Sequence, residues 1–406
     1  MANDSVITEK NFKRLSDYSL QINWWLLKPI GAWPSLSSIS RLEKIISFIL
    51  IFICYCLILS TVIPATLFII LEDESLYMKL KVLGPLGQWF IGTLNYTWLL
   101  LHSKSIQRCM EHVQKDWRIV TRSEDQQMML KNAKYGRYVA ASCAIFMHTS
   151  VLYNCVVTAL ITVIIEDGNE TRIIHNLPCP VYNKIIPVDT NPTNKIFLVA
   201  QFISGFIVTS ATVGAFGMTA VFAAHACGQL NVVMTWITEF VNQSRDPNKN
   251  LYFTEIGVIV KHHLRVLSLI ERIEDLINEI CFVELFKSTL VLCMLGYYIL
   301  MDWGSHDIQT LATHFMILVS MSMNIFVACY IGEILTQQCR KVGEVVYMTN
   351  WYYLRSKDIQ DLILIISRSS VVFKLTAGKI IHMSMYTFGD VMKTAFAYLN
   401  ILRQTM

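Results

Sequence analysis

Charged residues are scarce in this chain of 406 residues, at 16% of the total against 54% for hydrophobic residues. A soluble protein typically carries about a quarter charged residues, so this composition argues against a soluble fold. The apolar residues also gather in long runs, which is typical of a membrane protein with several spans. The net charge of +4 gives no reason to expect a nucleic-acid partner. The basic residues instead indicate which connecting segments lie on the cytosolic side of the membrane.

Motifs of catalysis are missing as well. The sequence has no constellation typical of a metal site, an activated nucleophile or a phosphate loop, so we expect no enzyme and no cofactor. No secretory signal peptide, internal repeat or low-complexity segment is visible.

The eleven cysteines show neither zinc-type spacing nor a disulfide framework. Six of them lie in apolar runs and should be small buried hydrophobes: Cys54, Cys56, Cys143, Cys155, Cys293 and Cys329. Cys179 is the only cysteine clearly in a candidate external loop.

The apolar runs predict an all-α membrane protein with seven transmembrane helices, each long enough to cross about 30 Å of hydrocarbon. The predicted spans are residues 45–71, 82–101, 138–165, 196–224, 283–301, 308–334 and 376–402. The chain then divides into an N-terminal segment (1–44), spans one to four (45–224), an amphipathic helical extension (225–282), spans five and six (283–334), a second helical region (335–375) and a last span (376–406). We expect an interfacial or re-entrant element around Trp24 and Trp25, since tryptophan favours the headgroup level.

Lys and Arg are unequally distributed between the segments that connect the spans. Twenty-five of them lie in four alternate segments, residues 1–44, 102–137, 225–282 and 335–375. The intervening segments hold five. Because basic residues are enriched on the cytosolic side, the N-terminus is predicted to be cytosolic and the C-terminus external.

The last predicted helix carries a stripe of mostly polar side chains: Asp390, Thr394, Tyr398, Ile401 and Thr405. Their spacings of four, four, three and four place them on one face at about 100° per residue. Such a stripe in a membrane span either packs on a polar neighbour or faces water. A carboxylate at membrane depth costs roughly 2.5–3.5 kcal/mol and usually marks a water-filled path. An intrahelical pair between Asp390 and Lys393 is the alternative explanation.

Residues 323–406 also carry a spaced pattern of residues: Tyr330, Gly332, Tyr347, Trp351, Tyr352, the runs 365–369 and 375–378, Phe388, Tyr398 and Leu402. This pattern resembles the C-terminal signature of the insect odorant receptors. Length and helix layout extend the resemblance over nearly the whole chain.

The resemblance implies a subunit of a tetrameric, odorant-gated, non-selective cation channel in the plasma membrane of olfactory sensory neuron dendrites. It implies that the last helices line a central pore and that the cytosolic ends of spans four to seven form the anchor between subunits. Family members that carry odour specificity assemble with a common co-receptor, which has an insertion between spans four and five. This chain lacks the insertion, so it resembles an odour-tuning subunit. The expected partners are the co-receptor, a small volatile ligand, the lipid bilayer and permeating cations.

The same resemblance assigns the gate of the pore. Ile401 and Thr405 match positions of the narrow external gate, and Gln404 and Tyr398 lie close by. An apolar ring at Ile401 would close a pore by dewetting. Thr405 is polar, whereas the co-receptor has apolar residues at both constriction positions.

The odorant pocket of the family lies in the outer half of spans two, three, four and six. Nine residues of this chain could line it: Trp89, Phe90, His148, Tyr153, Phe202, Phe206, Met316, Ser320 and Met323. A small volatile ligand needs a mostly apolar cavity with one or two polar groups, and His148 or Tyr153 could donate a hydrogen bond. The competing interpretation is ordinary helix-bundle core.

The main alternative function is a G-protein-coupled receptor, which would need an external N-terminus. A transporter would usually show inverted repeats and broken helices, and neither is found.

Glycosylation distinguishes a cytosolic N-terminus from the external N-terminus of a G-protein-coupled receptor. Asn169 is predicted to be external and glycosylated, Asn242 to be cytosolic, and Asn95 to lie inside the second span.

Overall fold

The computed structural model describes residues 2–34, 41–73, 76–167, 170–184, 186–245, 256–302, 308–371 and 373–404. Within these residues the chain is mostly helical, as the sequence predicts. The helices are α1 (Ala2–Leu27), α2 (Arg41–Leu71), α3 (Leu76–Leu101), α4 (Ser103–Ile119), α5 (Ser123–Leu160), α6 (Thr193–Arg245), α7 (Ile256–Asp302), α8 (Ile308–Met348), α9 (Ser356–Ser370) and α10 (Met385–Gln404). The shorter elements are β1 (Thr162–Asp167), β2 (Glu170–His175), the 3-10 helix η1 (Trp351–Tyr353), β3 (Thr376–Ala377) and β4 (Ile381–His382).

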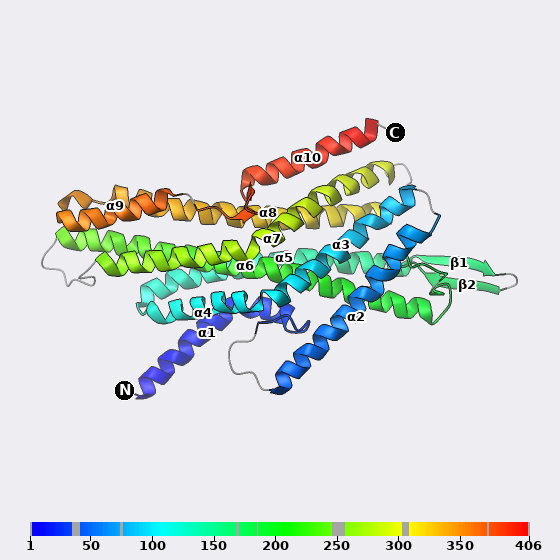
Figure 1. The fold of residues 1–406 in the computed structure, drawn as a ribbon, viewed down its shortest axis with the longest axis horizontal. Helices are drawn as coiled ribbons and strands as arrows, with labels where there is room; N and C mark the ends of the chain where they lie inside the picture. The colour runs from blue at the N-terminus through cyan, green and yellow to red at the C-terminus, as the bar shows by residue number, and fades with distance from the viewer. Residues whose placement is uncertain are drawn as a thin grey trace.

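Helix α6 is the centre of the bundle. It packs against α1, α2, α3, α5, α7 and α8, and every residue from 211 to 230 is buried. A helix that is apolar on all sides is stable only when it is surrounded, and α6 has this character. The long helices α5, α6, α7 and α8 run along the long axis of the molecule, while α2 and α3 cross it obliquely (Figure 1).

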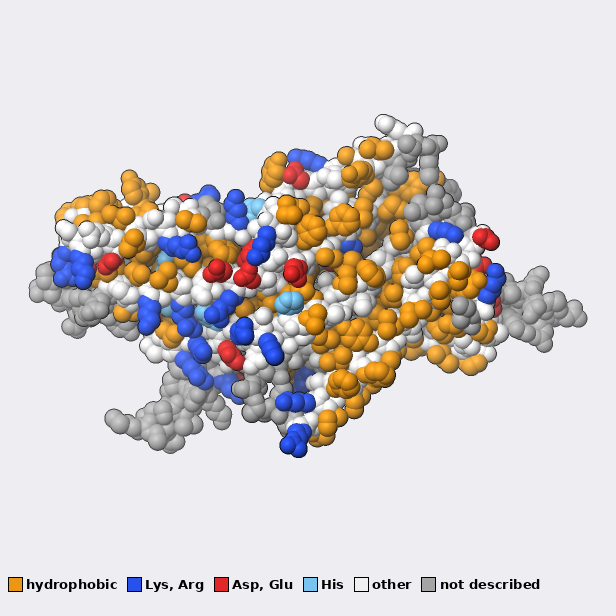
Figure 2. Space-filling view, in the orientation of Figure 1, with side chains coloured by type: hydrophobic (Ala, Val, Ile, Leu, Met, Phe, Trp, Pro, Cys, Tyr) orange, Lys and Arg blue, Asp and Glu red, His pale blue; other side chains and the backbone are white. Residues whose placement is uncertain are grey.

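The two halves of the molecule differ in surface chemistry. Apolar side chains cover the half that contains α2, whereas Lys and Arg gather over the half that contains α4 (Figure 2). We call the second half the polar end. Phe48 and Phe52 on α2 are 72% and 64% exposed, which suits a helix surrounded by lipid.

Five helices of the described residues are long and apolar enough to cross a membrane, by length and composition: α2, α5, α6, α7 and α8. Helices α3 and α10 do not meet this criterion within the described residues. The count of seven spans stays a prediction. Helix α6 and helix α7 each extend past the predicted spans into the polar end, so the predicted helical extension at 225–282 is helical over its described residues.

Two helices end or begin inside the spans predicted for them. Helix α5 ends at Leu160 rather than at 165, because the chain turns into the antiparallel hairpin of β1 and β2. The last helix begins at Met385, nine residues later than predicted, because residues 376–382 form a small hairpin. Gly378 and Lys379 adopt positive φ angles of 62° and 59° there, a conformation that glycine accepts at little cost.

One of the cysteine predictions is wrong. Cys56 is exposed, because it lies on the outward face of α2. Cys179 follows the β1–β2 hairpin but is buried, since Gln201 of α6 pairs with its backbone. The Cys179 N–H donates to Gln201 Oε1 at 2.9 Å, and the Cys179 carbonyl accepts from Gln201 Nε2 at 2.8 Å. All eleven cysteines are free thiols.

Candidate ligand and pore sites

Three of the predicted pocket residues lie together between α5 and α6. The His148 ring centroid lies 5.6 Å from that of Phe206, which in turn lies 5.1 Å from that of Phe202. His148 Nε2 lies 3.0 Å from Ser210 Oγ, and its Nδ1 lies 2.9 Å from the Ala144 carbonyl oxygen. Aromatic side chains around one imidazole–hydroxyl pair have the chemistry that suits a small neutral ligand.

Trp89 belongs to a different network. Its indole Nε1 donates to Ser204 Oγ at 2.9 Å, and Ser204 Oγ lies 3.0 Å from Thr61 Oγ1. All three residues are buried, so this network joins α3, α6 and α2. Its neighbour Phe90 is 54% exposed and turns away from the bundle.

The remaining predicted pocket residues lie along α5 and α8. The Ser320 hydroxyl of α8 donates to Met147 Sδ of α5 at 3.1 Å. Met316, Met323 and Tyr153 are partly buried. The nine residues therefore form separate packing groups around α6 rather than one enclosed chamber.

The stripe of α10 lies on the side of that helix that faces away from its own subunit. A neighbouring side of the helix is packed, with Val391 and Ala395 each only 6% exposed. Four described residues of the predicted pore face are exposed: Thr394, Tyr398, Ile401 and Gln404. Thr405, and the predicted glycosylation site Asn169, lie outside the described residues.

Asp390 is half-buried on the same helix. Its Oδ1 lies 3.9 Å from Lys393 Nζ, at the outer limit of an ion pair. The Lys393 side chain is 79% exposed, and an exposed pair of this kind contributes only about 0–1 kcal/mol. The pairing alternative is therefore geometrically possible but weak, and it leaves Asp390 able to attract cations.

The helix is held at its start by the β3–β4 hairpin and by α8. The Gly378 N–H donates to the Asn278 carbonyl at 2.8 Å, and the Met383 N–H donates to the Leu375 carbonyl at 2.9 Å. Gly332 of α8 lies against Met383, so close that a β-carbon at Gly332 would lie 2.3 Å from the Met383 carbonyl oxygen.

A buried ion pair in α7 was not predicted from the sequence. Lys287 Nζ lies 2.5 Å from Glu284 Oε1, and both side chains are about 95% buried, at 5% and 4% exposed. Lys287 also donates to Gln88 Oε1 of α3 at 3.0 Å, and Asn324 Nδ2 of α8 donates to Glu284 Oε1 at 3.1 Å. Two opposite charges three residues apart inside an apolar run were the available signal.

A second buried polar cluster, also missed, lies at the polar end. Asp116 of α4 is 1% exposed and accepts from Arg265 Nε of α7 at 2.5 Å. His225 Nε2 of α6 lies 3.1 Å from Asp116 Oδ2, and His112 Nε2 lies 3.7 Å from the same atom. The cluster therefore joins three helices through one carboxylate. Buried charge is stable only when it is paired in this way.

Electrostatics at the polar end favour a charged Asp116 and neutral His112, His262 and His263. Burial raises the pKa of Asp116, but the hydrogen bond and charge of His225, with His112 and Arg265, outweigh burial and hold the pKa below its ordinary value. Burial lowers the pKa of His112 to about 4, although Asp116 opposes the shift. Burial also lowers the pKa values of His262 and His263 to about 4.

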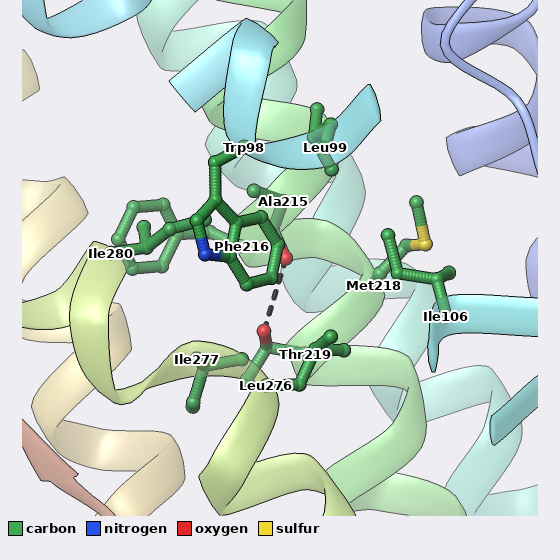
Figure 3. A pocket seen from close by; sticks show the side chains of 10 residues that line it. All are labelled: Trp98, Leu99, Ile106, Ala215, Phe216, Met218, Thr219, Leu276, Ile277 and Ile280. Carbon is green, nitrogen blue, oxygen red and sulfur yellow. Dashed lines mark hydrogen bonds between the residues drawn. The ribbon is translucent and has the colours of Figure 1, made fainter. Parts of the chain in front are cut away.

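Two of the cavities between the described helices are lined by none of the nine predicted pocket residues. The first, of about 10 Å³, lies between α3, α4, α6 and α7, where Trp98, Phe216 and Ile280 surround it (Figure 3). It is about the size of a single water molecule. The second, of about 80 Å³, lies between α5, α6 and α8.

A bundle with an apolar belt and a basic end defines a multi-span membrane protein, and comparison with known proteins gives its family. Residues 75–396 match the model of the 7tm Odorant receptor family. This match covers well over half of the chain, so the chain belongs to the odorant receptor family.

Individual relatives are distant. The chain is 24% identical to Odorant receptor 13a of Drosophila melanogaster over 245 residues, which are 56% of this chain and 58% of that receptor. It is 24% identical to Odorant receptor 83a of Drosophila melanogaster over 146 residues, which are 36% of this chain and 32% of that receptor. The alignments thus span about a third to three fifths of these relatives.

Solved structures support the fold. The insect olfactory receptor OR5 from Machilis hrabei superposes with a TM-score of 0.80 at 14% identity, covering 98% of this chain and 100% of that one. The same receptor in complex with eugenol superposes with a TM-score of 0.73 at 12% identity, with the same coverage.

Proposed function

We propose that this chain is the odour-tuning subunit of an odorant-gated, non-selective cation channel. In this proposal it assembles with a co-receptor subunit into a heterotetramer in the plasma membrane of olfactory neurons. The N-terminus is cytosolic, which makes the polar end the cytosolic end. Family membership and the basic charge of the polar end support the proposal.

One observation carries the channel assignment. Helix α10 has a packed side and an exposed side, and the exposed side carries the stripe with Thr394, Tyr398 and Ile401. At a subunit interface, the exposed stripe of such a helix faces water or a partner subunit. Four such helices around a central axis would enclose a conduit lined by their stripes. Ile401 is then the apolar ring of the gate.

The cytosolic ends of α8 and α9 supply a surface for assembly. Apolar side chains are exposed there on Tyr347, Met348, Ile363 and Leu364, between 55% and 81%. Contiguous exposed apolar side chains outside a membrane commonly mark protein interfaces. We infer that this surface packs against the neighbouring subunits.

The odorant is proposed to bind beside His148, Phe202 and Phe206. In the eugenol complex a related fold holds a small aromatic molecule, and the aromatic group of this chain has suitable chemistry for a small neutral ligand. The chemical identity of the odorant depends on side chains of this subunit rather than on the shared fold.

Recording of ionic current tests the proposal. Expressed alone, the chain should give no odorant-evoked current, and with the co-receptor it should give a non-selective cation current. Phe206→Ala should shift odorant sensitivity roughly tenfold or more, since the loss of a partly buried aromatic contact typically costs a few kcal/mol. Phe315→Ala is the matched control, because Phe315 is 58% exposed on α8. Strong currents from the chain alone would refute the tuning-subunit assignment.

Glycan mapping tests the orientation. Asn169→Gln should abolish the glycosidase-sensitive shift on a gel, whereas Asn242→Gln should leave the shift intact, because glycans are added only on the luminal side. Asn242 is exposed at the polar end, and Asn95 is buried with its Nδ2 donating to Thr212 Oγ1 at 3.1 Å. The reverse pattern would favour the orientation of a G-protein-coupled receptor.

A further inference from the structure

The cavity of about 80 Å³ between α5, α6 and α8 is separate from the proposed odorant site. Tyr135, which lines it, precedes His148 by 13 residues on the continuous helix α5. At 1.5 Å per residue the two residues lie about 20 Å apart along the helix axis. The cavity therefore lies toward the polar end of the same three-helix unit.

Its walls are apolar with a few neutral polar groups. Ala220, Ala223 and Ala224 of α6 form one wall, and the charged residue types Asp, Glu, Lys and Arg are not among its lining residues. A charged occupant would lose its hydration without compensation, so the occupant is uncharged. The cavity volume is about half that of the 150 Å³ engineered cavity that binds benzene. A volume of this size suits a ligand with roughly three to five carbon atoms.

One polar atom of the cavity lacks a partner. Gln338 lines the cavity, and its buried Oε1 accepts no hydrogen bond. Another polar group of the cavity is engaged, since Asn132 Nδ2 donates to the Met128 carbonyl at 2.9 Å. A buried acceptor without a donor is costly, so a hydroxyl group on the occupant would satisfy Gln338.

An aromatic stack links the cavity to the pore helix. Tyr330 of the cavity wall stacks on Phe326 with ring centroids 5.7 Å apart and planes at 9°. Phe326 meets Phe388 of α10 edge to face at 5.5 Å and 79°. Phe388 lies two residues before Asp390, so a shift of Tyr330 acts on the start of the pore-facing stripe.

We propose that this cavity is a second ligand site, for small uncharged alcohols of three to five carbons, and that its occupant modulates the channel through Tyr330, Phe326 and Phe388. The modulation rests on the proposed channel function, whereas the binding does not.

Photolabelling tests the binding. The full chain in membranes is illuminated with a diazirine derivative of 1-butanol, and the adducts are located by mass spectrometry. Adducts should lie in residues 132–139 and 330–338 and should be competed by excess 1-butanol. Gln338→Leu should reduce this labelling at least fivefold, and Gln337→Leu should not, because Gln337 is exposed and hydrogen-bonds to Glu333. Ala223→Ile, which fills the cavity, is the independent second variant. Adducts confined to lipid-facing residues, or equal labelling of wild type and Gln338→Leu, would overturn the site.

Current recordings test the modulation. In the assembled channel 1-butanol should change the odorant-evoked current at least twofold in wild type and in Gln337→Leu, but not in Gln338→Leu. Phe326→Leu should keep the labelling and lose the modulation. Modulation that persists in Phe326→Leu would overturn the aromatic route. Cavity labelling together with an absence of odorant-evoked current when the chain is co-expressed with the co-receptor would support the site and count against the channel proposal.

Discussion

Gly332→Ala should destabilise the protein by moving the start of α10. The added β-carbon would lie 2.3 Å from the Met383 carbonyl oxygen and 2.9 Å from Met383 Cβ. The nearest atom belongs to the backbone, and the Met383 N–H is already bonded to Leu375, so the contact cannot be relieved by a side-chain rotation. Overpacking of this kind typically costs about 1–3 kcal/mol.

The expected loss is partly offset by helix propensity. Alanine is about 0.5–1 kcal/mol better than glycine inside a helix, which leaves a net destabilisation of up to about 2.5 kcal/mol. Thermal unfolding of the purified protein in detergent would measure this loss. For domains of 150–250 residues, 1 kcal/mol corresponds to about 2–4 °C in the melting temperature.

Gly389→Ala is the matched control. Gly389 lies in α10, and a β-carbon there would meet no atom within 4 Å. This variant should raise the melting temperature through helix propensity alone. If both alanine variants raise it equally, the tight contact between Gly332 and Met383 is absent and the reasoning fails.

Two further predictions concern the buried polar groups. Glu284→Gln and Lys287→Met should each destabilise the protein by about 3–5 kcal/mol, because each leaves a buried charge unpaired. The double variant should lose less stability than the sum of the two single losses. Strictly additive losses in thermal unfolding would contradict the ion pair. Stability should fall as pH drops from 6.5 to about 4, since His112, His262 and His263 have folded-state pKa values of about 4 and the unfolded chain binds more protons in that window. His263→Leu should flatten this dependence, and an unchanged slope in denaturant titrations at several pH values would contradict the burial of neutral His263.

The helical membrane fold was predictable from the sequence because it depends on long apolar runs. Length and hydropathy alone indicate the runs within α2, α6 and α8, and no knowledge of neighbours is needed. The stripe of α10 was also predictable in its periodicity, and its described members Thr394, Tyr398 and Ile401 share the exposed side.

Features that depend on contacts between distant residues were not predictable. The hairpin before α10 replaces predicted helix because Gly378 bonds to Asn278, a hundred residues earlier in the chain. The cluster at Asp116 joins residues 149 positions apart in its bond to Arg265. The predicted pocket residues belong to the expected helices, but the side-chain partners of Trp89 and His148 follow from the way α3 and α5 pack on α6.

The exposed stripe of α10 is proposed to line the conduction path. Cysteine substitution tests it in the assembled channel, in a Cys56→Ser background, since Cys56 is the exposed native cysteine. Thr394→Cys and Tyr398→Cys should react with a charged, water-soluble thiol reagent while odorant is present, and the current should fall. Phe396→Cys is the matched control, because Phe396 is 60% exposed but lies off the stripe.

The account predicts a loss of current that depends on odorant at positions 394 and 398 and an unchanged current at 396. Equal modification at all three positions, or an unchanged current at 394 and 398 with normal surface expression, would contradict it.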